Sequence, residues 1–295
     1  MEIFRPAPLR LHRFFLSFSG RATIVSPVVS MKLIGCQFDL AWENQPANYA
    51  AVRRLLAAAP PPRGALVALP EMFATGFSMH VEAIVQPPGG PTEQFLAATA
   101  RELGIYLVGG VVTPGAHGRG RNEAVVFQPD GTLAARYAKL HSFSPAEENQ
   151  HYEPGNEVVM FDWAGIPAAV FICYDLRFPE VFRAAAARGA KLLVVIANWP
   201  TSRVDHWLAL LTARAIENQA YVLGVNRCGA TPKLEYPGRS VIVDPRGRTA
   251  AAAGAGEGLI EATPDWAALE SYRREFAILP DMRPDFVPQP QPRRA

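Results

Sequence analysis

The sequence predicts an α/β protein in which mixed β-sheets are covered by helices. Short apolar segments of strand length alternate with longer segments that carry apolar residues at helical spacing. Several neighbouring strand segments are joined by short turns, and these hairpins interrupt the parallel order that alternation alone would give. No self-similarity appears at the periods of repeat proteins. With 295 residues, the chain is long enough to form one large core.

The first half of the chain contains five predicted strands and two predicted helices. The strands are expected at 32–38, 64–70, 105–113, 122–128 and 132–140, and the helices at 46–59 and 91–104. The first three strands are almost wholly apolar, which is typical of buried strands. Consecutive prolines stop the first helix, whereas the second has Pro91 near its start and Gly104 after it. The last two strands flank a Pro-Asp-Gly turn and form a hairpin.

The second half begins with an irregular stretch at 141–156. Strands are then expected at 157–163, 167–172 and 191–198, with helices at about 176–188 and 203–218. Four closing strands (YVLGVNRC, SVIVD, TAAAA and GLIEA) precede a final helix at 266–276. We therefore expect one domain over 31–278 and a disordered or extended C-terminal tail over 279–295.

Residues 1–30 are treated separately, because they hold four arginines and a single glutamate. Met31 opens a clean strand pattern, so a disordered extension or a start codon assigned too early is favoured over a packed arm or a targeting segment. The chain has 29 basic and 27 acidic residues without a long basic run, and no nucleic-acid partner is expected. No run of 18 apolar residues exists, so no membrane partner is expected either.

The cysteine content favours a reducing compartment. Cys36, Cys173 and Cys228 are too few for a disulfide framework, which indicates a cytoplasmic protein. Cys36 and Cys228 lie within apolar strands and are expected to be inert.

Three chemically reactive side chains follow apolar strands directly. Glu71 comes after the strand at 64–70, Lys139 ends the strand pattern LAARYAKL, and Cys173 follows the strand at 167–172. Open α/β sheets place their functional sites at the carboxyl ends of strands. Each residue alone has an ordinary interpretation: a core cysteine, a loop carboxylate and a lysine on an edge strand. Their shared position makes a common site the stronger hypothesis.

The segment FICYDLRFPE resembles a strand followed by a sharp turn into a helix. Asp175 is expected to cap that helix, and Pro179 fits its first turn. Cys173 would then face a helix N-terminus, which favours a thiolate, and the Tyr174 N–H could donate to an oxyanion. A cysteine hydrolase also needs a proton shuttle and a second oxyanion donor, and Glu71 and Lys139 fit these roles.

The three segments LPEMFATGF, YAKLHSFSP and ICYDLRFPE resemble, in order, the Glu, Lys and Cys motifs of the nitrilase superfamily. The resemblance runs from Met31 to Phe276 and includes ANWP, LTARAIENQAYVLGVNR and YRREF. It implies a catalytic triad of Glu71, Lys139 and Cys173. It also implies an αββα sandwich, with two mixed sheets flanked by helices, that pairs as a homodimer through a shared four-layer core.

The same resemblance implies a second glutamate six residues before a Pro-Gly pair, and this position is Glu148. Its implied role is to hold the lysine and to help position substrate or water. The loop also contains His141, Glu147 and His151, but their spacing matches no compact zinc signature. No metal and no cofactor are expected.

Three aromatic residues are candidate walls of the substrate pocket: Phe77, Tyr174 and Trp199. Roles in the core are an alternative for each of them. Arg177 and Glu180 are expected to be structural and to pair within or beside the helix that follows Cys173.

The wording of these motifs most resembles the omega-amidase branch. Its members hydrolyse the terminal amide of short 2-oxo dicarboxylic acid monoamides, such as 2-oxoglutaramate and 2-oxosuccinamate, and release ammonia. A cationic or amide donor must then bind the substrate carboxylate, and the sequence does not identify it.

Alternatives within the superfamily are a nitrilase, an N-carbamoyl amidase and a deaminated-glutathione amidase. A catalytically inactive binding or scaffold protein is the alternative from another class. A papain-like pair of Cys173 with His80 or His141 is disfavoured, because neither histidine has that family's local signature.

Overall fold

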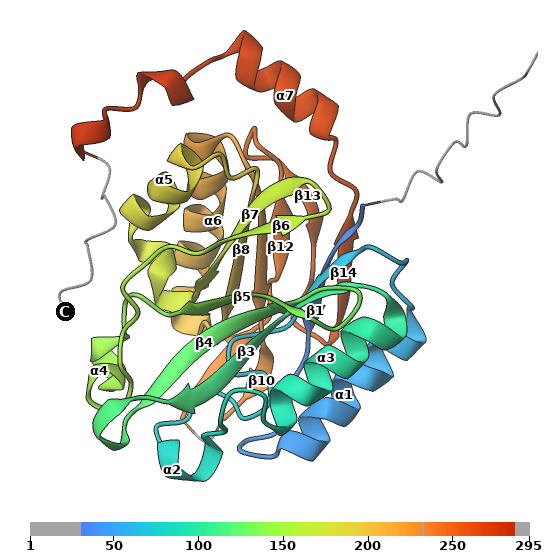
Figure 1. Cartoon of the computed structure of the whole chain (residues 1–295), viewed down its shortest axis with the longest axis vertical. Helices are drawn as coiled ribbons and strands as arrows, with labels where there is room; N and C mark the ends of the chain where they lie inside the picture. Colours follow the sequence, from blue (N-terminus) through green and yellow to red (C-terminus); the bar gives the residue numbers. More distant parts are fainter. Residues whose placement is uncertain (1–30, 232, 287–295) are drawn as a thin grey trace, which may run out of the picture.

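The computed structural model of the chain describes residues 31–231 and 233–286. These residues form four layers in the order helices, sheet, sheet, helices (Figure 1). Helices α1 (Gln45–Ala58) and α3 (Pro91–Leu103) cover one sheet, and α5 (Pro179–Ala187) and α6 (Val204–Asn218) cover the other. The predicted sandwich of two mixed sheets between helices is confirmed. Residues 1–30 and 287–295, where we expect an extension and most of the tail, lie outside the described residues.

The first sheet has six strands, of which the central three are parallel. Their order is β14 (Gly258–Ala262), β1 (Leu33–Gln37), β2 (Leu66–Ala68), β3 (Tyr106–Pro114), β4 (Gly120–Phe127) and β5 (Leu133–Ala138). Strands β1, β2 and β3 run parallel, and the other pairs are antiparallel. The last strand of the chain thus pairs with the first, a long-range contact that the strand pattern alone did not predict.

The second sheet repeats this plan. Its order is β13 (Thr249–Ala252), β12 (Val241–Val243), β9 (Tyr221–Asn226), β8 (Leu192–Ala197), β7 (Ile166–Ile172) and β6 (Met160–Trp163). Strands β7, β8 and β9 are parallel and wholly or largely buried, which explains their continuous apolar sequences. A separate two-stranded ribbon joins β10 (Cys228–Ala230) and β11 (Glu235–Pro237).

Two apolar cores hold the layers together. The larger one lies between the sheets, where Leu66 and Val108 of the first sheet share a cluster with Val170 and Val194 of the second. The smaller core lies between the first sheet and helices α1 and α3. Helix α3 has Pro91 in its first turn and ends at Gly104, whose left-handed backbone (φ 65°) suits glycine. The carboxyl ends of the parallel strands are therefore fixed by close packing on both sides.

The helix expected at 176–188 differs from the prediction. A short 3₁₀ helix, η3 (Cys173–Arg177), comes first, and α5 starts only at Pro179. Asp175 does not cap α5, because no side chain caps this helix and the residue at its N-cap is Phe178. Three further short elements were not predicted: α2 (Val81–Ile84), α4 (Glu148–His151) and β11.

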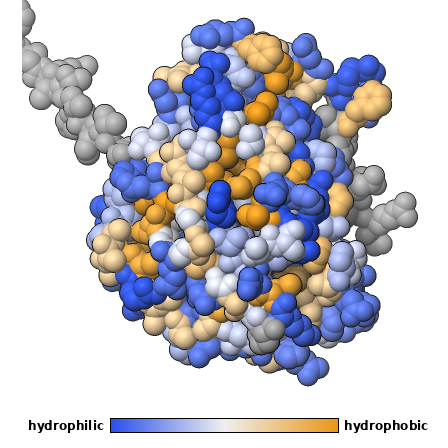
Figure 2. Space-filling model, turned by 180° about the vertical axis from the view of Figure 1, so that it is seen from behind, coloured by the Kyte–Doolittle hydropathy of each residue, from blue (hydrophilic) through white to orange (hydrophobic). Residues whose placement is uncertain are grey.

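The surface mixes hydrophobic and hydrophilic residues. On the face that Figure 2 shows, hydrophobic residues lie in small groups between hydrophilic ones. Helix α7 (Trp266–Glu275) lies at one end of the fold, beyond α5 and α6 (Figure 1). Within residues 31–231 and 233–286, none of the helices combines the length and the hydrophobicity needed to cross a bilayer.

Candidate active site

The three predicted side chains converge at one end of the two sheets. Glu71 follows β2, Lys139 follows β5 and Cys173 follows β7. The Lys139 Nζ donates to Glu71 Oε1 at 2.9 Å and to Glu148 Oε2 at 2.8 Å. All three charged side chains are at most 2% exposed. The structure thus places one ammonium between two carboxylates in a buried network.

Asn122 completes this network, and sequence reasoning missed it. Its Nδ2 donates to Glu71 Oε1 at 2.8 Å and to Glu148 Oε1 at 2.9 Å. Asn122 lies on β4, and its backbone carbonyl accepts a hydrogen bond from the Lys139 N–H. Asn122 thus lies opposite Lys139 in the hairpin, and this pairing depends on the register of β4 and β5.

Asn198 links the carboxylate of Glu71 to Cys173. The Asn198 N–H donates to Glu71 Oε2 at 2.9 Å, and its Nδ2 donates to the Glu71 carbonyl at 2.6 Å. The carbonyl oxygen of Asn198 lies 4.0 Å from Cys173 Sγ. Asn198 follows β8, the strand next to β7. Glu71 and Cys173 are consequently separated by a single bridging residue, although they are 102 positions apart along the chain.

The backbone is strained next to the predicted residues. Cys173 itself has a φ of +46°, and Met72, directly after Glu71, has a φ of +43°. Glu147, directly before Glu148, has a φ of +58°. Side chains other than glycine rarely adopt this left-handed region, and the conformation persists only where surrounding contacts hold it. The sharp turn expected at Cys173 is thus observed, although it leads into a 3₁₀ helix.

The charges of Glu71 and Lys139 stabilise each other. Burial raises the pKa of the Glu71 carboxyl, but the Lys139 ammonium and hydrogen bonds from neighbouring residues lower it by more. The net effect is a pKa below the ordinary value of a glutamate. Burial lowers the pKa of Lys139, but the charges of Glu148 and Glu71 more than reverse this effect and hold the pKa well above its ordinary value. A carboxylate and an ammonium therefore coexist at neutral pH.

The thiol of Cys173 differs from the prediction. Burial, followed by the charge of Glu71, raises its pKa well above the ordinary value, and the nearby Lys139 offsets only part of the increase. The site already holds two carboxylates and one ammonium, so a further negative charge is unfavourable. The raised pKa thus favours a neutral thiol next to an ionised carboxylate, where the sequence predicted a resting thiolate.

An open cavity of about 490 Å³ adjoins Cys173. Its lining includes all three predicted wall residues, Phe77, Tyr174 and Trp199. The Lys139 Nζ lies 5.1 Å from the centre of the Phe77 ring, so this ring separates the ammonium from part of the cavity. Cys173 therefore lines a cavity whose walls are mainly apolar.

Two arginines provide the positive charge among the residues that line this cavity, Arg177 and Arg203. The Arg177 Cζ lies 4.8 Å from the centre of the Trp199 ring, and the Arg203 Cζ lies 5.5 Å from that of Phe143. The pairing expected for Arg177 lies beside its helix: the guanidinium lies over Trp199, and its Nη2 lies 3.3 Å from His206 Nδ1 of α6. Arg203 was not predicted, nor were the lining residues Phe143, Leu234 and Tyr236.

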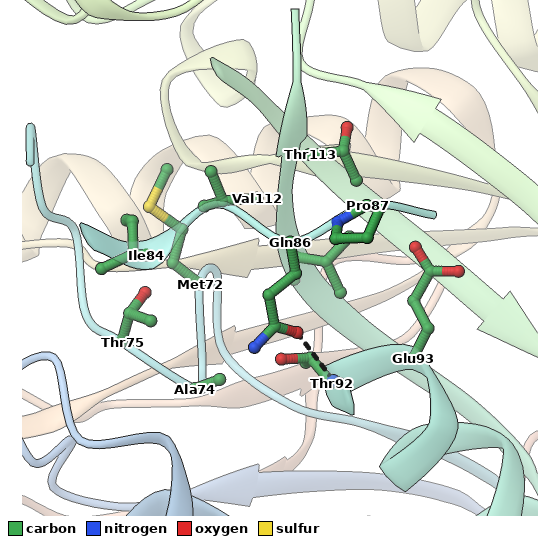
Figure 3. Close-up of a pocket in the computed structure, with 12 residues that line it drawn as sticks. Met72, Ala74, Thr75, Ile84, Gln86, Pro87, Thr92, Glu93, Val112 and Thr113 are labelled. Atoms are coloured by element: carbon green, nitrogen blue, oxygen red, sulfur yellow. Dashed lines mark hydrogen bonds between the residues drawn. The ribbon is translucent and has the colours of Figure 1, made fainter. Parts of the chain in front are cut away.

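A second pocket, of about 310 Å³, is lined in part by Met72, Ala74 and Thr75 of the loop that follows Glu71 (Figure 3). It shares no lining residue with the cavity of Cys173. Its polar side chains bond to one another and to nearby residues. Gln86 Oε1 accepts from the Thr92 N–H at 2.8 Å, and Glu93 accepts from Arg136 at 2.8 Å. This pocket is lined by no cysteine and lies beside the loop that follows Glu71.

The histidines considered for other chemistry are engaged elsewhere. His141 Nδ1 lies 2.9 Å from Asp175 Oδ1, and His80 Nδ1 lies 3.0 Å from Glu43 Oε1 on the surface. Neither arrangement is a Cys–His pair. In the part of the chain that the structure describes, no group of three or more His, Cys, Asp or Glu side chains is arranged to hold a metal ion.

Comparison with known proteins identifies the family. The family model described as carbon-nitrogen hydrolase matches residues 33–274. A 2-oxoglutaramate amidase of Bacillus subtilis (strain 168) is 32% identical, over 85% of this chain and 98% of the relative. An omega-amidase of Escherichia coli (strain K12) is 36% identical, over 85% of this chain and 96% of the relative.

Solved structures agree with this family. A carbon-nitrogen hydrolase superfamily protein of Xanthomonas campestris, with an arsenic adduct in its active site, superposes with a TM-score of 0.80 at 33% identity, over 86% and 97% of the two chains. An amidase of Nesterenkonia sp. AN1, with acrylamide added to its active-site cysteine, superposes with a TM-score of 0.72 at 28% identity, over 84% and 98%. The chain described here belongs to the carbon-nitrogen hydrolase family of the nitrilase superfamily and is an amide-hydrolysing enzyme.

Proposed function

We propose that this enzyme is an omega-amidase that hydrolyses the terminal amide of short 2-oxo dicarboxylic acid monoamides through a thioester on Cys173. The observation that carries the proposal is the buried network of Glu71, Lys139 and Glu148, together with a neighbouring cavity that is lined by Cys173 and two arginines. The related amidase whose active-site cysteine reacts with acrylamide supports Cys173 as the nucleophile.

The first half-reaction starts from the neutral thiol. Glu71 takes the proton of Cys173 while the sulfur attacks the amide carbon, so that no isolated thiolate accumulates. The developing oxyanion accepts hydrogen bonds from the Lys139 ammonium and the Tyr174 N–H. Tyr174 is the second residue of η3, where an N–H has no partner within its own helix. The carbon–nitrogen bond then breaks, and Glu71 protonates the nitrogen, which leaves as ammonia.

The second half-reaction reverses these roles. A water molecule takes the place of ammonia, and Glu71 accepts one of its protons as the oxygen attacks the thioester carbon. The same two donors bind the second oxyanion. The carbon–sulfur bond breaks, the sulfur regains the proton from Glu71, and the 2-oxo dicarboxylate leaves. Glu148 keeps the Lys139 ammonium in place throughout, because both of its oxygens accept from Nζ.

The positive charge in the cavity lining supports this substrate class. A 2-oxo dicarboxylic acid monoamide has an amide at one end and a carboxylate at the other. Arg177 and Arg203 offer planar guanidinium groups that suit a carboxylate, and Cys173 lines the same cavity. The names of the related 2-oxoglutaramate amidase and omega-amidase support this assignment.

Ammonia release from a panel of compounds tests the proposal. The panel contains 2-oxoglutaramate, 2-oxosuccinamate, an N-carbamoyl amino acid, deaminated glutathione and a simple nitrile. We expect the highest kcat/KM for the two 2-oxo monoamides. Arg177→Leu should raise KM for these substrates more than for an uncharged amide. A preference for another compound would move the enzyme to a different branch, and no turnover of any compound would favour an inactive binding protein.

A homodimer and a cytoplasmic location are also proposed. The dimer rests on the resemblance to the superfamily, and light scattering should give a mass near twice 32.1 kDa. A mass near 32.1 kDa across micromolar concentrations would contradict the dimer.

The proposed cytoplasmic location rests on the three cysteines, which are free and therefore suit a reducing compartment.

A further inference from the structure

Asp175 is a buried carboxylate that accepts hydrogen bonds from four donors. It is 0% exposed and lies two residues after Cys173. Its Oδ2 accepts from the Tyr137 hydroxyl at 2.7 Å and from the Ile172 N–H at 3.0 Å. Its Oδ1 accepts from the His141 N–H at 2.9 Å and lies 2.9 Å from His141 Nδ1. These partners satisfy a carboxylate that burial would otherwise strongly disfavour.

The donors come from the two segments that carry the lysine and the cysteine. Tyr137 lies on β5 of the first sheet, two residues before Lys139, and His141 lies two residues after it. Ile172 ends β7 of the second sheet and directly precedes Cys173. One carboxylate therefore joins the backbone on both sides of Lys139 to the backbone next to the sulfur.

The other contacts of the site hold other pairs of groups together. The carboxylates of Glu71 and Glu148 hold the Lys139 ammonium, and the Asn198 N–H holds Glu71. The Asp175 bonds join the Lys139 segment directly to the turn at Cys173, whose positive φ has to be held by its surroundings.

We infer that Asp175 is a positioning residue that sets the separation between the Lys139 ammonium and the Cys173 sulfur. This inference rests on the proposed function of Cys173 as nucleophile. An asparagine at this position has nearly the same size but presents an NH₂ group to donors that need an acceptor. The Asp175→Asn variant should therefore loosen the contact between the two segments while it keeps the residues in the cavity unchanged.

The test compares Asp175→Asn with Glu93→Gln, a matched control. Glu93 is also a buried carboxylate that accepts several hydrogen bonds, but it lies at the pocket beside the loop that follows Glu71. We expect Asp175→Asn to lower kcat about 100-fold, as for a displacement of about 1 Å, with little change in KM. Glu93→Gln should lower the melting temperature but leave kcat unchanged.

A second readout needs no substrate. The rate at which iodoacetamide alkylates Cys173 is measured against pH. In Asp175→Asn the profile should move to higher pH, because the ammonium no longer lies close to the sulfur, and in Glu93→Gln it should stay. The alkylation measurement separates the positioning role of Asp175 from the proposed amidase function. If the wild-type enzyme hydrolyses no amide in the panel, the proposed function fails, but the alkylation profiles still report on positioning.

Tyr137→Phe covers the case in which Asp175→Asn does not fold. It removes one of the donors to Asp175 without leaving a buried donor unpaired. We expect kcat to fall about fivefold, which matches the loss of one hydrogen bond, and the alkylation profile to move in the same direction. A folded variant at either position with wild-type kcat and a wild-type alkylation profile would overturn the inference.

Discussion

The two sheets share a plan but contribute different chemistry. Each has three parallel central strands flanked by antiparallel ones, and each directs the carboxyl ends of these strands toward the site. The first sheet supplies charge through Glu71 and Lys139, whereas the second supplies the sulfur of Cys173 and the bridging amide of Asn198. Neither half is complete, so the reaction depends on how the sheets are held against each other.

Removal of the sulfur tests the contribution of the second sheet and should have the largest effect. Cys173→Ala and Cys173→Ser are expected to lower kcat by several orders of magnitude. Alanine has no nucleophile, and a serine hydroxyl is too weakly acidic for a carboxylate whose pKa is lowered. Ammonia release from 2-oxoglutaramate measures the effect, with circular dichroism as a check of the fold. Wild-type turnover in either variant would remove Cys173 from the mechanism.

Removal of the ammonium tests the first sheet. Lys139→Met leaves Glu71 and Glu148 as two buried carboxylates without a cation, and should cost about 3–5 kcal/mol of unfolding free energy as well as turnover. The double variant Lys139→Met/Glu148→Gln should recover part of the stability but none of the activity. Urea denaturation measures the unfolding free energy. An unchanged unfolding free energy in Lys139→Met would show that the network contributes little.

Substitutions at two neighbouring glycines on β3 test the Glu71 loop separately from the packing of its sheet. A Cβ on Gly110 would overlap the Met72 nitrogen and lie 2.9 Å from Glu71 Cα, whereas one on Gly109 would meet the end of the flexible Leu96 side chain. Gly110→Ala should cost about 1–3 kcal/mol and lower kcat up to about 100-fold. Gly109→Ala should lower stability alone. Equal kcat values in the two variants would contradict the role of this loop.

The acid limb of the pH profile reports on Glu71. The carboxyl must be ionised to accept the thiol proton, so activity is lost as pH falls through its pKa. Because that pKa is lowered, kcat/KM should stay high down to pH values below the ordinary pKa of a glutamate. Asn122→Ala removes one of the hydrogen bonds that lower it and should move the acid limb to higher pH. It should also cost about 1–3 kcal/mol. An acid limb that moves to lower pH would contradict Glu71 as the base.

An exposed ion pair of the first sheet provides the smallest expected effect. Lys32 and Glu261 lie 2.7 Å apart, like the buried pair, but their side chains are 30% and 56% exposed. Glu261→Gln should change the unfolding free energy by less than about 1 kcal/mol and leave kcat unaltered. Thermal denaturation and the ammonia assay check both quantities. A loss comparable to that of Lys139→Met would mean that burial does not explain the difference between the pairs.

The sequence predicted the layers and the reactive residues, but not the residues that connect them. Glu71, Lys139 and Cys173 could be predicted because each follows an apolar strand within a recognisable motif. Asn122 could not be placed by counting back from the hairpin turn, because the register between β4 and β5 shifts by one residue at Val126 and Phe127. An unshifted hairpin would have put residue 121 opposite Lys139.

Long-range contacts explain the other differences. Asp175 was assigned to the nearest helix, whereas its donors other than the Ile172 N–H come from β5 and from the loop after Lys139, 34 or more residues earlier. The cavity walls at Leu234 and Tyr236 come from a loop and ribbon late in the chain, which no local pattern connects with Cys173. The raised pKa of the thiol depends first on burial and then on the charges of the buried cluster, and both exist only in the folded chain.

The central claim is that both half-reactions pass through one thioester on Cys173, and interception by hydroxylamine tests it most directly. The enzyme is given 2-oxoglutaramate or the 5-methyl ester of 2-oxoglutarate, which share an acyl group but differ in their leaving group, with Cys173→Ala as the control. After subtraction of the reaction without enzyme, a common thioester predicts the same ratio of hydroxamate to acid from both substrates and neither product from the control. Ratios that depend on the leaving group, or product from Cys173→Ala above the enzyme-free rate, would contradict the account.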